Sequence, residues 1–267
     1  MKALKEKLKN GYISILDYFN EAFKLFWHLI RKEKKWILLI FAILLITAII
    51  EKKLQTITLL NSKINLEYIF ISHFLTYPLY ATYWVLYRKI IFKLTDRNEN
   101  LNILKSYIKA FITAIIISIP ILIITICSFY IDFLKYSHSY ELISLISQIS
   151  LSVIIFSVVV ACIFIYFLQV HMSKDLPLKE TLNYTLEVSQ SNRWRYIVCF
   201  LIESAAVFFI KTIIKTVTAF FMILLHLNIE SIGIIIIKTF IENFVPALSA
   251  IYSISLISII FVNVDYQ

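Results

Sequence analysis

Glycine is almost missing from this chain, whose 267 residues include only Gly11 and Gly233. A loop that cradles phosphate and the turn that exposes a hydrolase serine both need closely spaced glycines. A side chain there would block the backbone conformation or the approach of the substrate. ATP-driven activity and classical serine hydrolysis are therefore excluded.

Cysteine and histidine are also few and scattered. No cysteine belongs to a Cys-x-x-Cys pair, and the five histidines form no His-Glu-x-x-His or other paired spacing. Zinc and redox chemistry need such groupings, whereas isolated cysteines in apolar stretches act as small hydrophobic residues. The sequence thus predicts no metal, no cofactor and no enzymatic activity. The three cysteines are Cys127, Cys162 and Cys199.

Charge is scarce as well, since only 16% of the residues are charged and 60% are hydrophobic. The mean hydropathy is +0.82. Soluble domains average about 25% charged and about 45–50% apolar residues, so lipid is the expected solvent. The composition predicts an all-α, polytopic membrane helix bundle that forms one integral membrane domain over residues 1–267.

Six apolar stretches approach or exceed the roughly 20 residues that cross a bilayer as a helix. The segment 216–242 is apolar too, and it forms either an outer hairpin or extensions of the two flanking helices. The count rises to seven or eight if that hairpin or the first amphipathic helix inserts. We expect spans at about 34–51, 66–88, 107–131, 142–170, 195–215 and 243–264.

Basic residues are unevenly shared between the two sides of this bundle. Residues 1–35, 88–109 and 171–195 carry 19 lysines and arginines, and the connections on the other side carry 7. Because short cytoplasmic loops are enriched in basic residues, both termini are predicted to be cytoplasmic in the cell membrane. The net charge of +9 then indicates contact with anionic lipid headgroups and not with nucleic acid.

Two cytoplasmic segments are predicted to be amphipathic helices at the membrane interface, at about 12–31 and 177–191. The first has polar side chains spaced by three or four residues among apolar ones, as interfacial helices do. The second begins at Pro177 and has a polar stripe opposite three leucines. The first polar stripe is Asp17, Glu21, Lys24, His28 and Arg31; the second is Glu180, Asn183, Glu187 and Gln190, opposite Leu178, Leu182 and Leu186.

The stretch Leu176–Ser189, followed by Trp194 and the fifth span, resembles part of a known set of proteins. These are uncharacterised bacterial six-helix integral membrane proteins related to the membrane domain of glycerophosphoryl diester phosphodiesterase. The resemblance implies a short helix ending at Ser189 before the fifth span, and a bacterial inner membrane location. It brings no catalytic residue, and the chain departs from the family pattern at Leu176, where a small residue is common.

Ionisable residues inside spans are expensive and are functional candidates. Glu203 is the deepest, and it either donates as a neutral carboxyl to Ser253, Ser255 or Ser258 or couples a proton to transport. Lys211 and Lys215 are expected near the outer interface, where they snorkel or form ion pairs with Glu242; Lys238 belongs to the same group.

Prolines interrupt three of the predicted spans, at Pro78, Pro120 and Pro246. A proline in a membrane helix frees a carbonyl and permits a kink, which either opens a cavity or is an ordinary feature of the bundle. Two functions are compatible with these patterns. The favoured one is a non-enzymatic envelope or scaffold protein that binds lipid or protein partners. The alternative is a small transporter for an amphipathic or lipid-like solute, with Glu203 as its coupling carboxylate.

Overall fold

The computed structural model describes residues 2–61, 66–95, 102–136, 140–224 and 232–267. All regular secondary structure in these ranges is helical, as the sequence predicts. In chain order the helices are α1 (Lys2–Lys9), α2 (Ile15–Lys32), α3 (Lys34–Asn61), α4 (Leu66–Leu94), α5 (Ile103–Tyr136), α6 (Tyr140–Ile163), α7 (Phe167–Ser173), α8 (Leu178–Leu224) and α9 (Ile232–Asp265).

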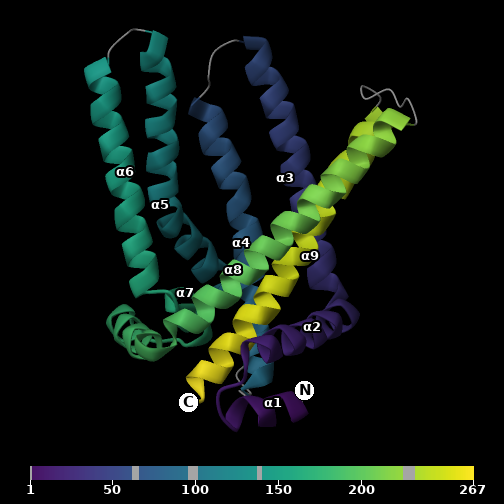
Figure 1. The fold of residues 1–267 in the computed structure, drawn as a ribbon, viewed down its shortest axis with the longest axis vertical. Helices are drawn as coiled ribbons and strands as arrows, with labels where there is room; N and C mark the ends of the chain where they lie inside the picture. The colour runs from purple at the N-terminus through teal and green to yellow at the C-terminus, as the bar shows by residue number, and fades with distance from the viewer. Residues whose placement is uncertain (1, 62–65, 96–101, 137–139, 225–231) are drawn as a thin grey trace.

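Three long helical hairpins rise from a base of short helices (Figure 1). The hairpins are α3 with α4, α5 with α6, and α8 with α9, and each pair is in contact. Helices α1, α2 and α7 lie across one end of the hairpins, where both termini are also found. We call this end the base. The most basic segments of the sequence meet there.

Four helical segments in the described part of the chain are long and apolar enough to cross a membrane. The chain is therefore a helical membrane protein. Helices α3 and α4 are also long, at 28 and 29 residues, but the apolar run of α3 is shorter and that of α4 is rich in tyrosine. The four segments are Ile103–Ser128, Tyr140–Ile163, Leu178–Phe220 and Phe244–Asp265.

Helices α3 and α8 continue well past the predicted boundaries. Helix α3 runs on to Asn61, so the charged residues that follow Ile50 do not end it. Helix α8 is one element of 47 residues, and it joins the predicted amphipathic helix at 177–191 to the predicted span at 195–215. Neither helix contains glycine or proline, so no residue breaks the backbone hydrogen-bond ladder. Because α8 reaches Leu224 and α9 starts at Ile232, the segment 216–242 mainly extends these two helices.

The predicted span at 142–170 is wrong at its end, because the helix breaks after Ile163 and α7 starts at Phe167. No glycine or proline marks the break. The side chain of Tyr166 is fully buried there, and its hydroxyl donates to the carbonyl oxygen of Asn192 at 3.1 Å. The end of this helix therefore coincides with a tertiary contact to α8.

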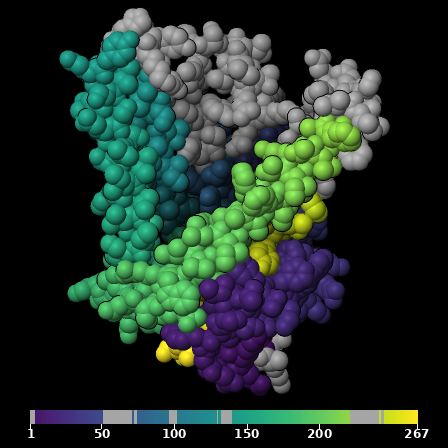
Figure 2. Space-filling model, viewed as in Figure 1, coloured from purple at the N-terminus to yellow at the C-terminus, as the bar shows by residue number. Residues whose placement is uncertain are grey.

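The buried core lies toward the base and not in the middle of the hairpins. It is built from one face of α2, the last turns of α4, α7 and the second half of α9. The described side chains of α6 are all at least partly exposed, as expected for a helix surrounded by lipid. Figure 2 shows a hollow between α6 and α8 above this base. The hairpins therefore join at the base and separate above it.

Asn263 on α9 holds the first two helices against the bundle. Its side chain is fully buried. The amide oxygen accepts from the backbone N–H of Ile13 at 3.3 Å and from the Tyr18 hydroxyl at 2.7 Å. The amide nitrogen donates to the carbonyl oxygens of Leu8 and Gly11, both at 2.9 Å. Gly11 has a φ of 130°, a conformation that favours glycine and that turns the chain between α1 and α2.

Candidate functional site

Helix α2 has one apolar face inside the protein and another outside it. The inner face packs on α9 and includes Tyr18, Ala22 and Leu25. The outer face carries Leu16, Phe23 and Trp27, which are 76%, 54% and 45% exposed. Large apolar side chains at this exposure, on a helix that crosses the base, suit insertion into the membrane interface.

The polar stripe predicted for this helix is only partly solvent-exposed. Glu21 is buried, and its carboxylate accepts from Lys24 at 2.9 Å and from Lys7 of α1 at 3.2 Å. Lys7 also donates to Asp17 at 2.7 Å. Lys7 of α1 thus forms ion pairs with two acidic residues of the stripe, which are therefore not free to face solvent alone.

Exposed cations gather where α2 ends and α3 begins. Arg31, Lys32, Lys34 and Lys35 are all exposed, and only Glu33 interrupts them. The carboxylate of Glu33 is turned inward, where it accepts from Lys89 at 2.6 Å and Lys93 at 2.5 Å. Burial alone would raise the pKa of Glu33, but these two hydrogen bonds outweigh it and hold the pKa below the ordinary value. We call Arg31, Lys32, Lys34 and Lys35 the basic corner.

The helical segment that carries the resemblance does not pack against the protein by its leucine face. Of the three leucines opposite the polar stripe, Leu178 and Leu186 are exposed by 62% and 39%. The residues that are buried form a mixed stripe one position away: Thr181, Thr185, Val188 and Ser189. Ser189 is thus inside the protein, whereas the predicted polar stripe from Glu180 to Gln190 is exposed as expected.

A second ionic cluster ties three parts of the base together. The guanidinium of Arg88 donates to both carboxylate oxygens of Asp175, at 3.0 and 2.6 Å. Lys109 donates to Asp175 at 3.3 Å and to the carbonyl oxygen of His171 at 2.6 Å. The hydrogen bond from Arg88, together with the charges of Arg88 and Lys109, holds the pKa of Asp175 well below its usual range.

Glu203, the main candidate from the sequence, lies between α8 and α9 and is 6% exposed. Its Oε1 atom is hydrogen-bonded to the hydroxyl of Ser253, one of the three serines expected near it. The Ser253 hydroxyl also donates to the carbonyl oxygen of Ser249 at 2.9 Å. A hydroxyl has one proton, so Ser253 can donate to only one of these two oxygens at a time, and a neutral Glu203 would supply the proton for the second hydrogen bond.

The change Glu203→Gln tests this arrangement, because a glutamine amide can donate to Ser253 as a neutral carboxyl does. The free energy of unfolding in micelles should change by less than about 1 kcal/mol. Wild type and variant should also share the same dependence of unfolding on pH between 5 and 8. If the wild type alone depends on pH in this range, Glu203 titrates, as a coupling group must.

The predicted ion pairs near the outer end are only partly described by the structure. Lys211 and Lys215 are exposed on α8, beyond the core. The side chains of Lys238 and Glu242 lie outside the described residues, and so does the predicted pairing with Glu242. Exposure fits snorkelling of the two lysines.

A cavity of about 390 Å³ lies between α4 and α5, with α7 as its floor. Two of the three prolines are close in sequence to residues that line it. Tyr77 precedes Pro78 by one residue, and Ser118 precedes Pro120 by two. The third, Pro246, is on α9, away from the lining residues, and its carbonyl oxygen accepts from Ser249 at 2.9 Å. The walls of this cavity come from three helices, so it could not be located from local sequence patterns. Glu203 is not among the residues that line it.

Metal-ligating side chains are not clustered in the described part of the chain. No group of three or more histidine, cysteine or acidic side chains there could hold a metal ion, and the three cysteines are free. Comparison with protein-family models, with curated proteins and with solved structures gives no match to this chain. The resemblance to the six-helix bacterial proteins therefore stays a prediction.

Proposed function

We propose that this chain is a six-span protein of the cell membrane, with α3 and α4 as its first two spans and the base in the cytoplasm. It acts without catalysis, as an envelope or scaffold protein that binds anionic lipid headgroups through its base. The observation that carries the proposal is the basic corner next to the outward apolar face of α2.

These two features are complementary to one kind of surface. Leu16, Phe23 and Trp27 suit the boundary between headgroups and acyl chains, where tryptophan is favoured. The four cations of the basic corner follow directly on the same helix and its successor. Each basic residue near an anionic membrane surface contributes about 1 kcal/mol of attraction, which salt screens. A bilayer surface rich in anionic lipid meets both features at once.

The fluorescence of Trp27 provides a direct test. A chain with Trp36, Trp84 and Trp194 changed to Phe retains Trp27 alone, and it can be reconstituted with lipids brominated near the headgroup. Brominated phosphatidylglycerol should quench Trp27 several-fold more effectively than brominated phosphatidylcholine at low salt. Changing all four cations of the basic corner to Gln should bring the two lipids to nearly equal quenching.

The matched control is the double change Lys211→Gln and Lys215→Gln, which removes two exposed cations from the other end of α8. It should leave the lipid preference unchanged. The remaining basic residues of the base still outnumber those of the opposite side, so the orientation of the chain is expected to persist. Equal quenching by both lipids in the parent protein would falsify the proposal.

A carrier with Glu203 as its coupling carboxylate is less well supported. Glu203 is bonded to Ser253 between two helices, and it lies outside the cavity that a solute could enter. The scaffold function needs no charged group inside the membrane. It also agrees with the lack of catalytic groupings in the sequence.

A further inference from the structure

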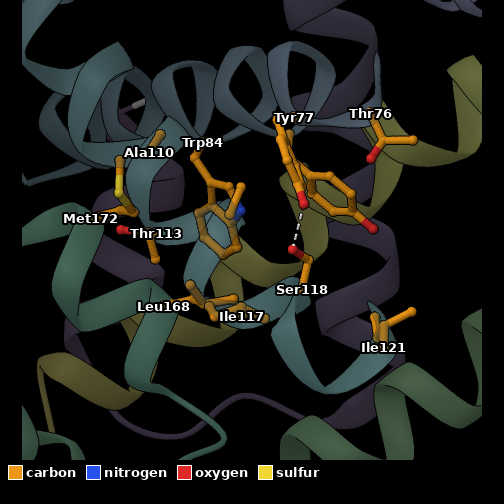
Figure 3. Close-up of a pocket in the computed structure, with 12 residues that line it drawn as sticks. Thr76, Tyr77, Trp84, Ala110, Thr113, Ile117, Ser118, Ile121, Leu168 and Met172 are labelled. Atoms are coloured by element: carbon orange, nitrogen blue, oxygen red, sulfur yellow. Dashed lines mark hydrogen bonds between the residues drawn. The ribbon is translucent and has the colours of Figure 1, made fainter. Parts of the chain in front are cut away.

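The cavity between α4, α5 and α7 is lined by residues without charge (Figure 3). Apolar side chains come from α5 and α7, including Ile117, Ile121 and Leu168. In Figure 3, Trp84 stands in the middle of the site, with Met172 and Thr113 on one side and Tyr77 and Ser118 on the other. The volume of about 390 Å³ falls within the range of small-molecule sites, about 300–1,000 Å³.

The hydroxyl groups that line the cavity are mostly occupied by the protein itself. Ser118 donates to the carbonyl oxygen of Ile115 at 2.8 Å, so Tyr77 donates to Ser118 across the 2.7 Å between their oxygens. Thr113 donates to the carbonyl oxygen of Lys109 at 2.7 Å. With these protons used internally and no charge on the walls, the cavity favours an apolar occupant over an ion or a sugar.

The cavity is open at the level of the spans. Tyr80, Ile117 and Ile121 line it and are still 52%, 43% and 55% exposed. Ile117 and Ile121 belong to the segment Ile103–Ser128, which is long and apolar enough to span a membrane, so in a bilayer their exposed sides would meet hydrocarbon. A molecule that enters here comes sideways from the lipid and not from water.

The helices around the cavity contain residues that permit bending and leave space between them. Proline at Pro78 and Pro120 removes a backbone donor from each of the two facing helices, which permits them to bend apart. Ala110 and Ala114 leave room on the α5 side. Met172 of α7 also lines the cavity, and a methionine side chain can adapt its shape to an irregular occupant.

From this geometry we infer that the cavity is a binding site for one acyl chain of a membrane phospholipid, which enters laterally between α4 and α5. The inference rests on the membrane embedding but not on the headgroup preference of the base. Either can therefore fail alone.

The test compares two variants of α5 in nanodiscs of zwitterionic phosphatidylcholine. Ala114→Trp fills the cavity, whereas Ile116→Trp adds the same side chain at an outward position that is 59% exposed. After transfer to detergent, native mass spectrometry should find one phospholipid retained by the wild type and by Ile116→Trp. Retention should fall at least tenfold in Ala114→Trp. Equal retention by all three proteins overturns the inference.

Photochemical labelling of the wild type gives an answer even if Ala114→Trp does not fold. A phosphatidylcholine with a diazirine on one acyl chain should label the peptides that contain Trp84 and Met172 several-fold more than the lipid-facing α6. Uniform labelling over all exposed helices would mean that lipid only fills the gap as bulk solvent, and it would overturn the inference. Because this lipid has no net charge, the result is independent of the Trp27 quenching experiment.

Discussion

Asn263→Leu should be the most destabilising of the changes considered, because it removes all four hydrogen bonds of a fully buried amide. The Tyr18 hydroxyl and the Ile13 N–H lose their acceptor inside the protein. Each buried group left unsatisfied costs about 1–3 kcal/mol. Gln267 also donates to the Leu8 carbonyl oxygen, which therefore keeps a partner. We expect a loss of about 3–4 kcal/mol, which lowers the unfolding midpoint by roughly 10 °C.

The measurement is thermal unfolding in micelles, together with limited proteolysis of α1, which should be released first. Asn20→Leu is the matched control, since it makes the same change at an exposed position of α2. Tyr18→Phe should lie between them, at about 1 kcal/mol, because it removes one hydrogen bond and leaves the amide in place. A loss in Asn263→Leu no greater than in the control would show that α1 and α2 are not held by this residue.

Asp175→Asn should have the second largest effect, because it leaves the Arg88 guanidinium without its counter-charge. The side chain of Arg88 is 8% exposed, and that of Asp175 is 44% exposed. Removing one partner of a fully buried pair costs about 3–5 kcal/mol, and solvent at the carboxylate reduces this to about 2 kcal/mol here. Thermal unfolding at neutral pH should show this loss, and the exposed Glu187→Gln should not.

The same pair predicts how the difference between wild type and Asp175→Asn depends on pH. The pKa of Asp175 is lower in the folded protein than its ordinary value of 3.8. Its contribution is therefore fully present above about pH 5 and is lost as the pH falls toward the folded pKa. The difference in unfolding free energy should shrink steadily below pH 4. A difference that stays constant down to pH 2 would mean that the charge of Asp175 does not stabilise the base.

Some of this protein follows from composition and from local pattern alone. The low charge and the long apolar runs determine that it is a helical membrane protein, because no soluble core could bury them. The helix over 12–31 also follows from local spacing, and the structure has it at Ile15–Lys32 with Ser14 as its N-cap. The sequence has no glycine or proline between 178 and 224, and this is why α8 can be one continuous helix.

Other features became clear only in the tertiary structure, because they depend on contacts between residues that are far apart in the sequence. The break before α7 lies where Tyr166 contacts Asn192, and the inner face of α8 near Ser189 is the face that other helices cover. Glu21 is buried, and it forms an ion pair with Lys7 of α1. Periodicity shows that a helix has two faces, but in a chain this apolar it does not show which face meets protein and which meets lipid. The cavity between α4, α5 and α7 has the same origin, since it exists only where three helices meet.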